Sequence, residues 1–96
     1  MAAYLIVLRE GSVRDQPAYD EYQRMNQENP TIGKLTPLVV YGALHGLEGV
    51  SPDGMVMIQF DSVEDARAWY ESPTYQAALP HRLRCADWRA FIVEGM

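Results

Sequence analysis

Short apolar runs alternate along the chain with segments whose apolar residues recur at helical spacing. The first run, residues 3–8, is continuous and rich in strand-forming side chains, so it predicts a strand. Asp15 then fits an N-cap, with Pro17 in the first turn of an amphipathic helix. We expect this helix to end before Pro30, because a residue that precedes proline avoids the helical region.

The middle of the chain predicts two further strands. Pro37 precedes an apolar run, and we expect a strand over residues 38–44, with a kink or bulge at the glycines that follow. The sequence Ser-Pro-Asp-Gly at 51–54 is a strong turn signal. Residues 55–60 then form the third predicted strand.

A second helical segment and a last strand complete the pattern. Ser62 begins a capping box in its acidic variant, and Ser72 followed by Pro73 predicts a fresh helix start. Pro80 lacks a backbone N–H, so we expect it to break or redirect this helix. Residues 88–94 predict the final strand. The order βαββαβ indicates an α+β fold, in which a four-stranded antiparallel sheet carries both helices on one face.

The predicted strands are apolar on both faces. Successive side chains alternate between faces, so each strand has two sets of apolar residues. In the first strand they are Tyr4, Ile6 and Leu8 against Ala3, Leu5 and Val7. In the third they are Met55 and Met57 against Val56, Ile58 and Phe60, and in the last Phe91 and Val93 against Trp88, Ala90 and Ile92. Helices cover one face, and a soluble monomer rarely leaves the other so apolar. We therefore expect a homodimer through the open sheet face. The alternatives are a longer loop over this face or a merely hydrophobic rim.

Length and composition narrow the class of protein. A chain of 96 residues holds one domain, residues 1–96. The formal net charge of −5 and the single lysine, Lys34, disfavour nucleic acid as a partner. No apolar stretch approaches the ~20 residues that span a bilayer, so we expect no membrane partner and a cytoplasmic location. Cys85 is alone and is expected to be a small, half-buried thiol.

One candidate acid–base pair lies near the predicted end of the second strand. His45 and Glu48 are three residues apart in a glycine-containing segment. If the backbone kinks there, both would face a cavity beside Trp69 and Tyr75, where a His close to a Glu can transfer protons near neutral pH. The alternative is a surface histidine and a structural glutamate.

Charged residues also follow the predicted break in the second helix. They are Arg82, Arg84 and Asp87. An arginine at this place could bind a ligand carboxylate in bidentate fashion. The alternative is a set of ion pairs that tie the helix exit to the last strand, to the partner chain or to Glu48.

Many aromatic rings are predicted on the two helices, among them Tyr19, Tyr22, Trp69 and Tyr75. Rings at helical spacing usually form core, but several hydroxyls converging in an apolar cleft would suit a small ring-containing ligand. The two histidines and the cysteine lack metal-ligand spacing, and GALHGLEG lacks the order of a phosphate-binding loop. We therefore expect no metal and no cofactor.

Several segments together resemble a known family: AYLIV, YDEY, LEG, SVEDARAWYESPTYQAALPHRLRCAD and FIVEG. With them the sequence is similar, over nearly its whole length, to the family called domain of unknown function 1330. The resemblance implies a ferredoxin-like fold assembled as a dimeric α/β barrel, and almost nothing about chemistry. The segment NPTIGKLTPL at 29–38 departs from the family, which is shorter there.

Three functions remain open on the sequence. The first is a homodimeric binding module whose pocket between sheet and helices holds a small organic, possibly aromatic, molecule. The second follows by analogy with the superfamily, which includes cofactor-free isomerases and monooxygenases that act on small organic substrates. The third is a structural dimer without a ligand.

Overall fold

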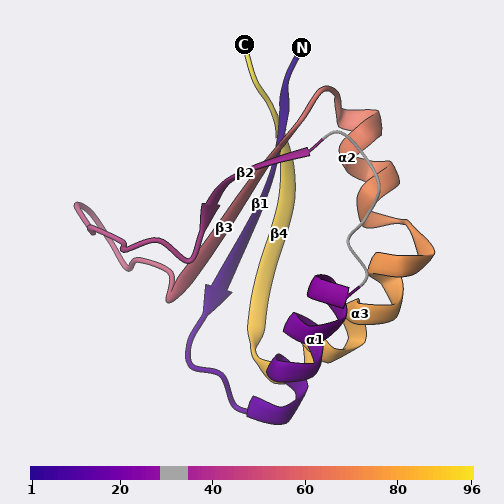
Figure 1. The fold of residues 1–96 in the computed structure, drawn as a ribbon. Coiled ribbons are helices and arrows are strands. Elements are labelled where there is room, and N and C mark those ends of the chain that lie inside the picture. The colour runs from indigo at the N-terminus through magenta and orange to yellow at the C-terminus, as the bar shows by residue number, and fades with distance from the viewer. Residues whose placement is uncertain (29–34) are drawn as a thin grey trace.

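The computed structural model describes residues 1–28 and 35–96 (Figure 1). In chain order the elements are β1 (Ala3–Glu10), α1 (Gln16–Glu28), β2 (Leu35–Val40), β3 (Gly54–Phe60), α2 (Val63–Tyr70), α3 (Pro73–Cys85) and β4 (Asp87–Glu94). The strands form one antiparallel sheet in the order β2-β3-β1-β4. The three helices lie on one face of this sheet, which confirms the predicted α+β architecture (Figure 1).

Leu5, near the middle of β1, shows how the core is built. It lies opposite Ile58 of β3 and Ile92 of β4, so three apolar side chains from adjacent strands project to the same side. Leu5 is only 2% exposed and packs in one cluster with Ala66 of α2. The core therefore lies between the sheet and the helices, where alternation along the strands predicts it.

The sequence correctly predicts how the first two helices begin. The side chain of Asp15 accepts a hydrogen bond from the backbone N–H of Ala18 at 3.1 Å. The hydroxyl oxygen of Ser62 accepts from the N–H of Asp65, also at 3.1 Å. Each cap satisfies a donor that the first helical turn leaves without a partner.

The helix α3 begins as predicted but does not end as predicted. Ser72 is its N-cap. The expectation that Pro80 breaks or redirects the helix is wrong, because α3 continues through it to Cys85. A proline inside a helix costs about 3 kcal/mol, and burial of side chains on both sides of Pro80 offsets that cost. The buried stripe consists of Tyr75, Ala78, Leu79, Arg82 and Cys85.

The second strand also differs from the prediction. It covers residues 35–40 within the described chain and not 38–44. Its register against β3 shifts between Pro37 and Val39. Since proline has no N–H to donate to the ladder, the regular pairing is interrupted there. The remaining strands differ from their predicted bounds by two residues or fewer at their ends.

After β2 the chain leaves the sheet, and residues 41–53 form the connection to β3. In Figure 1 this connection extends beyond the sheet, on the side away from the helices. Most of its side chains are exposed. The predicted helix end before Pro30 falls outside the described residues, as does most of the segment 29–38.

Candidate functional site

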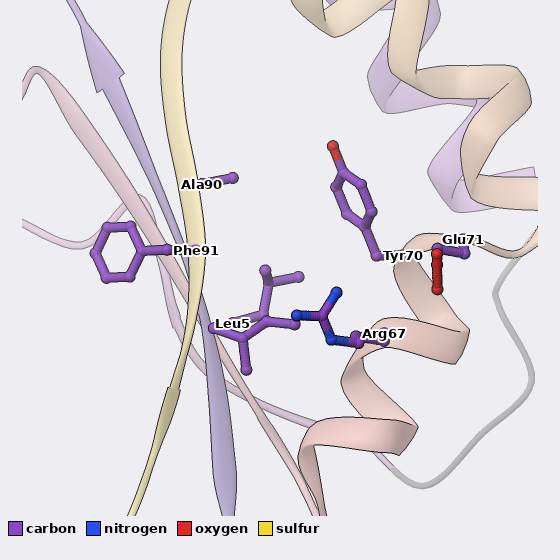
Figure 2. Close-up of a pocket in the computed structure, with 7 residues that line it drawn as sticks. Leu5, Arg67, Tyr70, Glu71, Ala90 and Phe91 are labelled. Carbon is purple, nitrogen blue, oxygen red and sulfur yellow. The ribbon is translucent and has the colours of Figure 1, made fainter.

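A cleft of about 370 Å³ opens between α2 and the strands β1 and β4 (Figure 2). The residues that line it are Leu5, Arg67, Tyr70, Glu71, Ala90, Phe91 and Ile92. In Figure 2 the side chains of Arg67 and Tyr70 reach from the helix toward the strands, and Ala90 points back toward them. Phe91 points out of the opposite face of the sheet. The cleft therefore has an apolar floor on the sheet and polar groups on the helix.

The dimensions of this cleft suit a small organic molecule. An apolar cavity of about 150 Å³ is enough to hold benzene, and ligand pockets begin at roughly 300 Å³. The guanidinium, phenol and carboxylate on the α2 side are the few polar groups that orient a ligand in an apolar site. The three residues that carry them, Arg67, Tyr70 and Glu71, are spaced i, i+3 and i+4 along the chain. That spacing is the signal by which sequence reasoning could have found this wall.

Three of the aromatic residues predicted for a site meet in the core beside the cleft. The rings of Trp69 and Tyr75 are 4.4 Å apart, and the hydroxyls of Tyr22 and Tyr75 are 2.8 Å apart. The ring of Tyr70, which lines the cleft, lies 5.4 Å from that of Tyr75. Tyr22, Trp69 and Tyr75 thus form the layer behind the cleft and are not part of its lining. Burial, above all, raises the pKa of Tyr75.

Tyr19, the fourth predicted aromatic residue, packs against a different partner. Its ring lies 6.4 Å from that of Tyr41, and its hydroxyl accepts a hydrogen bond from Gln23 at 2.8 Å. Tyr41 has a φ of 54°, a left-handed conformation that costs a non-glycine residue about 1–2 kcal/mol. Its ring lies against Gly54, where an added Cβ would come within 3.2 Å of it. Burial and the hydrogen bond with Tyr19 raise the pKa of Tyr41.

Two of the three charged residues at the end of α3 form ion pairs. Arg84 lies 3.8 Å from the carboxylate of Asp15, and Asp87 pairs with Arg14 at 2.9 Å. Both contacts tie the end of α3 and the start of β4 to the connection between β1 and α1. They have the structural role that the sequence left open as an alternative to ligand binding.

Arg82 differs from its neighbours because it is buried, at 2% exposed. Its guanidinium lies over the ring of Trp88, 5.3 Å from the ring centre. The backbone oxygen of Arg82 accepts hydrogen bonds from the indole N–H of Trp88 at 2.8 Å and from the thiol of Cys85 at 3.1 Å. Cys85 is fully buried and not half-buried as expected, since it belongs to the buried stripe of α3.

His45 and Glu48 do not approach the aromatic layer within this chain. Both are exposed in the connection of residues 41–53, which extends away from the helices (Figure 1). The expected kink toward Trp69 and Tyr75 is wrong for the single chain. The strand ends earlier than predicted, so the glycine-containing segment continues past the sheet and does not fold back over it. Glu48 consequently pairs with neither Arg82 nor Arg84.

Within residues 1–28 and 35–96, no three His, Cys, Asp or Glu side chains gather where they could hold a metal ion. In the same part of the chain, no helix combines the length and the apolar character that crossing a membrane requires.

Solved structures of other proteins have a similar fold. A protein of the ethyl tert-butyl ether d (ethd) family from Bacillus halodurans C-125 superposes with a TM-score of 0.64 at 19% identity, over 100% of both chains. A dimeric ferredoxin-like protein of unknown function from Thermobifida fusca YX gives 0.61 at 19% identity, over 97% of this chain and 90% of that one. A third, from Jannaschia sp. CCS1 and also described as dimeric and ferredoxin-like, gives 0.66 at 13% identity, over 99% and 100%. At these identities the likeness shows the fold alone.

Sequence comparison identifies the family. No curated protein matches the chain significantly. The family described as Domain of unknown function (DUF1330) matches residues 2–96, which is almost the entire chain. The matched range includes α2 and α3. The chain therefore belongs to the DUF1330 family and has a ferredoxin-like fold.

Proposed function

We propose that the protein is a homodimer in which each protomer binds a small, ring-containing organic molecule in the cleft between α2 and the sheet. The cleft itself carries this proposal. It combines a volume of about 370 Å³ with an apolar floor on β1 and β4 and polar groups on one wall. This is the composition of a ligand site and differs from that of a filled core. A purely structural dimer would instead be expected to have a filled interior between the sheet and the helices.

The open face of the sheet supports the dimer. Ile6 of β1 lies opposite Met57 of β3 and Phe91 of β4, on the face without helices. Tyr4, Leu8, Met55 and Val93 extend this apolar surface along the same strands. Phe91 is 45% exposed in the single chain. Covering such a surface stabilises an assembly by roughly 25 cal/mol for each Å² of apolar area removed from water.

The neighbours from Thermobifida fusca and Jannaschia support the same assembly, since both are described as dimeric. In a face-to-face dimer the two open sheets cover each other about a two-fold axis. The helices, and with them the clefts, then remain on the outside of the assembly. Each cleft would stay open to solvent and to a ligand.

A charge on the open face tests the dimer. Phe91→Glu should shift the molar mass, measured by size-exclusion chromatography with light scattering, from that of two chains to that of one. The matched control is Leu83→Glu, because Leu83 is 53% exposed and lies on α3. It introduces the same charge outside the proposed interface and should leave the dimer intact. A wild-type monomer at micromolar concentration would refute the assembly.

Filling the cleft tests the binding. Ala90 points into the cleft, so Ala90→Phe should block it while leaving β4 in place, since phenylalanine is well accepted in strands. Ala68→Phe on the exposed side of α2 is the matched control. The probe is 3-phenylpropanamide, a neutral ring-containing molecule, titrated by calorimetry and by amide NMR shifts. Binding should be lost in the first variant and retained in the second. Equal binding in both would place the probe elsewhere.

A further inference from the structure

The guanidinium of Arg82 is a buried positive charge without a counter-charge in the described chain. Its Nε and Nη1 atoms have no hydrogen-bond partner there. Other arginines do form ion pairs in the structure. Arg14, Arg24, Arg84 and Arg89 each lie close to the carboxylate of an aspartate or glutamate. An arginine cannot lose its proton in a protein, and an unpaired buried ion costs several kcal/mol. An anion placed against these two N–H groups would offset that cost.

Trp88 compensates this charge only in part. The guanidinium stacks over the indole ring at 5.3 Å, a contact worth up to about 2 kcal/mol when water is excluded. Such a contact places the cation over the π face of the ring. The N–H groups project along the plane of the guanidinium, where a carboxylate binds them. The contact with Trp88 thus supplies no oxygen acceptor, and Nε and Nη1 remain without one in the described chain.

A second donor lies in the same part of the core. The hydroxyls of Tyr22 and Tyr75 share one hydrogen bond. Two phenols carry two hydrogens, so one hydrogen remains for another acceptor. Tyr75 and Arg82 belong to the same buried stripe of α3, and the charge of Arg82 acts on the Tyr75 phenol by lowering its pKa against the larger effect of burial. A buried O–H donor therefore lies in the same stripe of α3 as the guanidinium, where it can also donate to an anion.

Residues that line the cleft adjoin this region on both walls, although Arg82 itself does not line it. On the sheet, Trp88 precedes Ala90 by two residues on the same face of β4, a separation of about 7 Å. On the helix side, Tyr70 lines the cleft and packs against Tyr75. A substituent on a ring held in the cleft would extend past Ala90 and Tyr70 toward Arg82.

We infer that the molecule bound in the cleft is an organic carboxylate, with its ring between α2 and β4 and its carboxylate on Arg82. This inference rests on the proposed function and specifies its ligand class. The carboxylate supplies the acceptors that Nε and Nη1 lack, and it neutralises the buried charge. Binding such an anion therefore offsets the cost of burying the charge of Arg82.

The test compares an acid with its neutral amide. The probes are 3-phenylpropionate and 3-phenylpropanamide, titrated by calorimetry into the wild-type protein and into Arg82→Met, which keeps an apolar stem of similar length. The acid should bind the wild type at least tenfold more tightly than the amide. Arg82→Met should abolish this preference, so that acid and amide bind the variant with similar affinity. Should that variant fail to fold, the Arg82 Nε resonance of the wild type gives a second readout, because only the acid should shift it.

The failures of the two proposals are distinguishable. If acid and amide bind equally, and Ala90→Phe weakens both, the carboxylate assignment is wrong and the cleft still binds ligands. If neither probe binds the wild type, the proposed function fails and the inference fails with it. Arg67 lines the cleft and is the competing cation. Loss of the acid preference in Arg67→Met, with the preference intact in Arg82→Met, would overturn the assignment to Arg82.

Discussion

The hydroxyl of Tyr22 in α1 lies 2.8 Å from the hydroxyl of Tyr75 in α3, deep between the two helices. The rings meet edge to face, with an interplanar angle of 82°. The two residues are 53 positions apart, so this contact joins the first half of the chain to the second. Ala78 and Leu79 pack in the same cluster. The pair thus gives the α1–α3 contact a specific geometry in addition to its apolar area.

Removing either hydroxyl should destabilise the protein. We expect Tyr75→Phe and Tyr22→Phe each to lower the free energy of unfolding by about 1 kcal/mol, because each leaves a buried hydroxyl without its partner. The double variant should lose less than the sum of the two single losses, since no hydroxyl is then left unpaired. Urea unfolding followed by tryptophan fluorescence measures all four values. Strict additivity would show that the hydroxyls do not interact.

Stability should fall in alkaline solution because burial raises the pKa of Tyr75 above its usual value of about 10. The stability contributed by the neutral phenol is fully present below pH 10. It is lost as the pH rises above 10, because the unfolded chain then releases a proton that the folded chain retains. The loss should reach about 1.4 kcal/mol per pH unit for one such tyrosine. Unfolding measured between pH 9 and pH 11 should show a shallower decline in Tyr75→Phe. If stability fell equally steeply with pH in the wild type and in Tyr75→Phe, Tyr75 would not be the cause of the decline.

Replacing Pro80 should stabilise the protein. Pro80 is exposed and lies inside α3, so Pro80→Ala restores a helical hydrogen bond without disturbing the core. We expect a gain of about 1–3 kcal/mol in the free energy of unfolding, reduced by the greater freedom of alanine in the unfolded chain. Pro73→Ala is the control. Pro73 occupies the first turn of the same helix, where proline is favourable, and its replacement should bring no gain.

Ser72 joins the end of α2 to the start of α3 through two hydrogen bonds. Its hydroxyl donates to the backbone oxygen of Trp69 at 2.7 Å and accepts from the N–H of Tyr75 at 3.3 Å. Ser72→Ala should cost about 1–2 kcal/mol, and Ser72→Asp should recover the part due to the cap, because aspartate accepts but does not donate. Thermal unfolding can measure these differences in stability, because 1 kcal/mol moves the unfolding midpoint of such a domain by about 4–8 °C. If Ser72→Ala unfolded at the same midpoint as the wild type, the two hydrogen bonds of Ser72 would not stabilise the connection between α2 and α3.

The sequence predicted the sheet and the helix starts well because both depend on local chemistry. Alternation along β1 placed Leu5 and Ile6 on opposite faces, as the register shows. Ser62 was correctly predicted as a cap because a hydroxyl needs only the next helical turn to act. Pro80 was mispredicted because the local rule omits the burial of side chains on both sides of it.

The candidate site was harder to predict because it depends on packing between distant elements. His45 and Glu48 were placed by assuming where β2 ends, and sequence does not fix where a strand leaves a sheet. The cleft exists partly because Ala90 is small where a larger residue on β4 would fill the space beside Tyr70. The burial of Arg82 likewise results from the approach of Trp88, which follows α3 on a separate strand.

The outer strands of the sheet limit how copies of this protein can associate. On one side, Pro37 and the register shift interrupt the row of backbone donors along β2. On the other side, β4 carries charges of both signs at Asp87, Arg89 and Glu94. The interrupted ladder of β2 and the charges of β4 both disfavour pairing with a strand of another molecule. Association through the apolar face can therefore end at two copies, without sideways growth into fibrous aggregates.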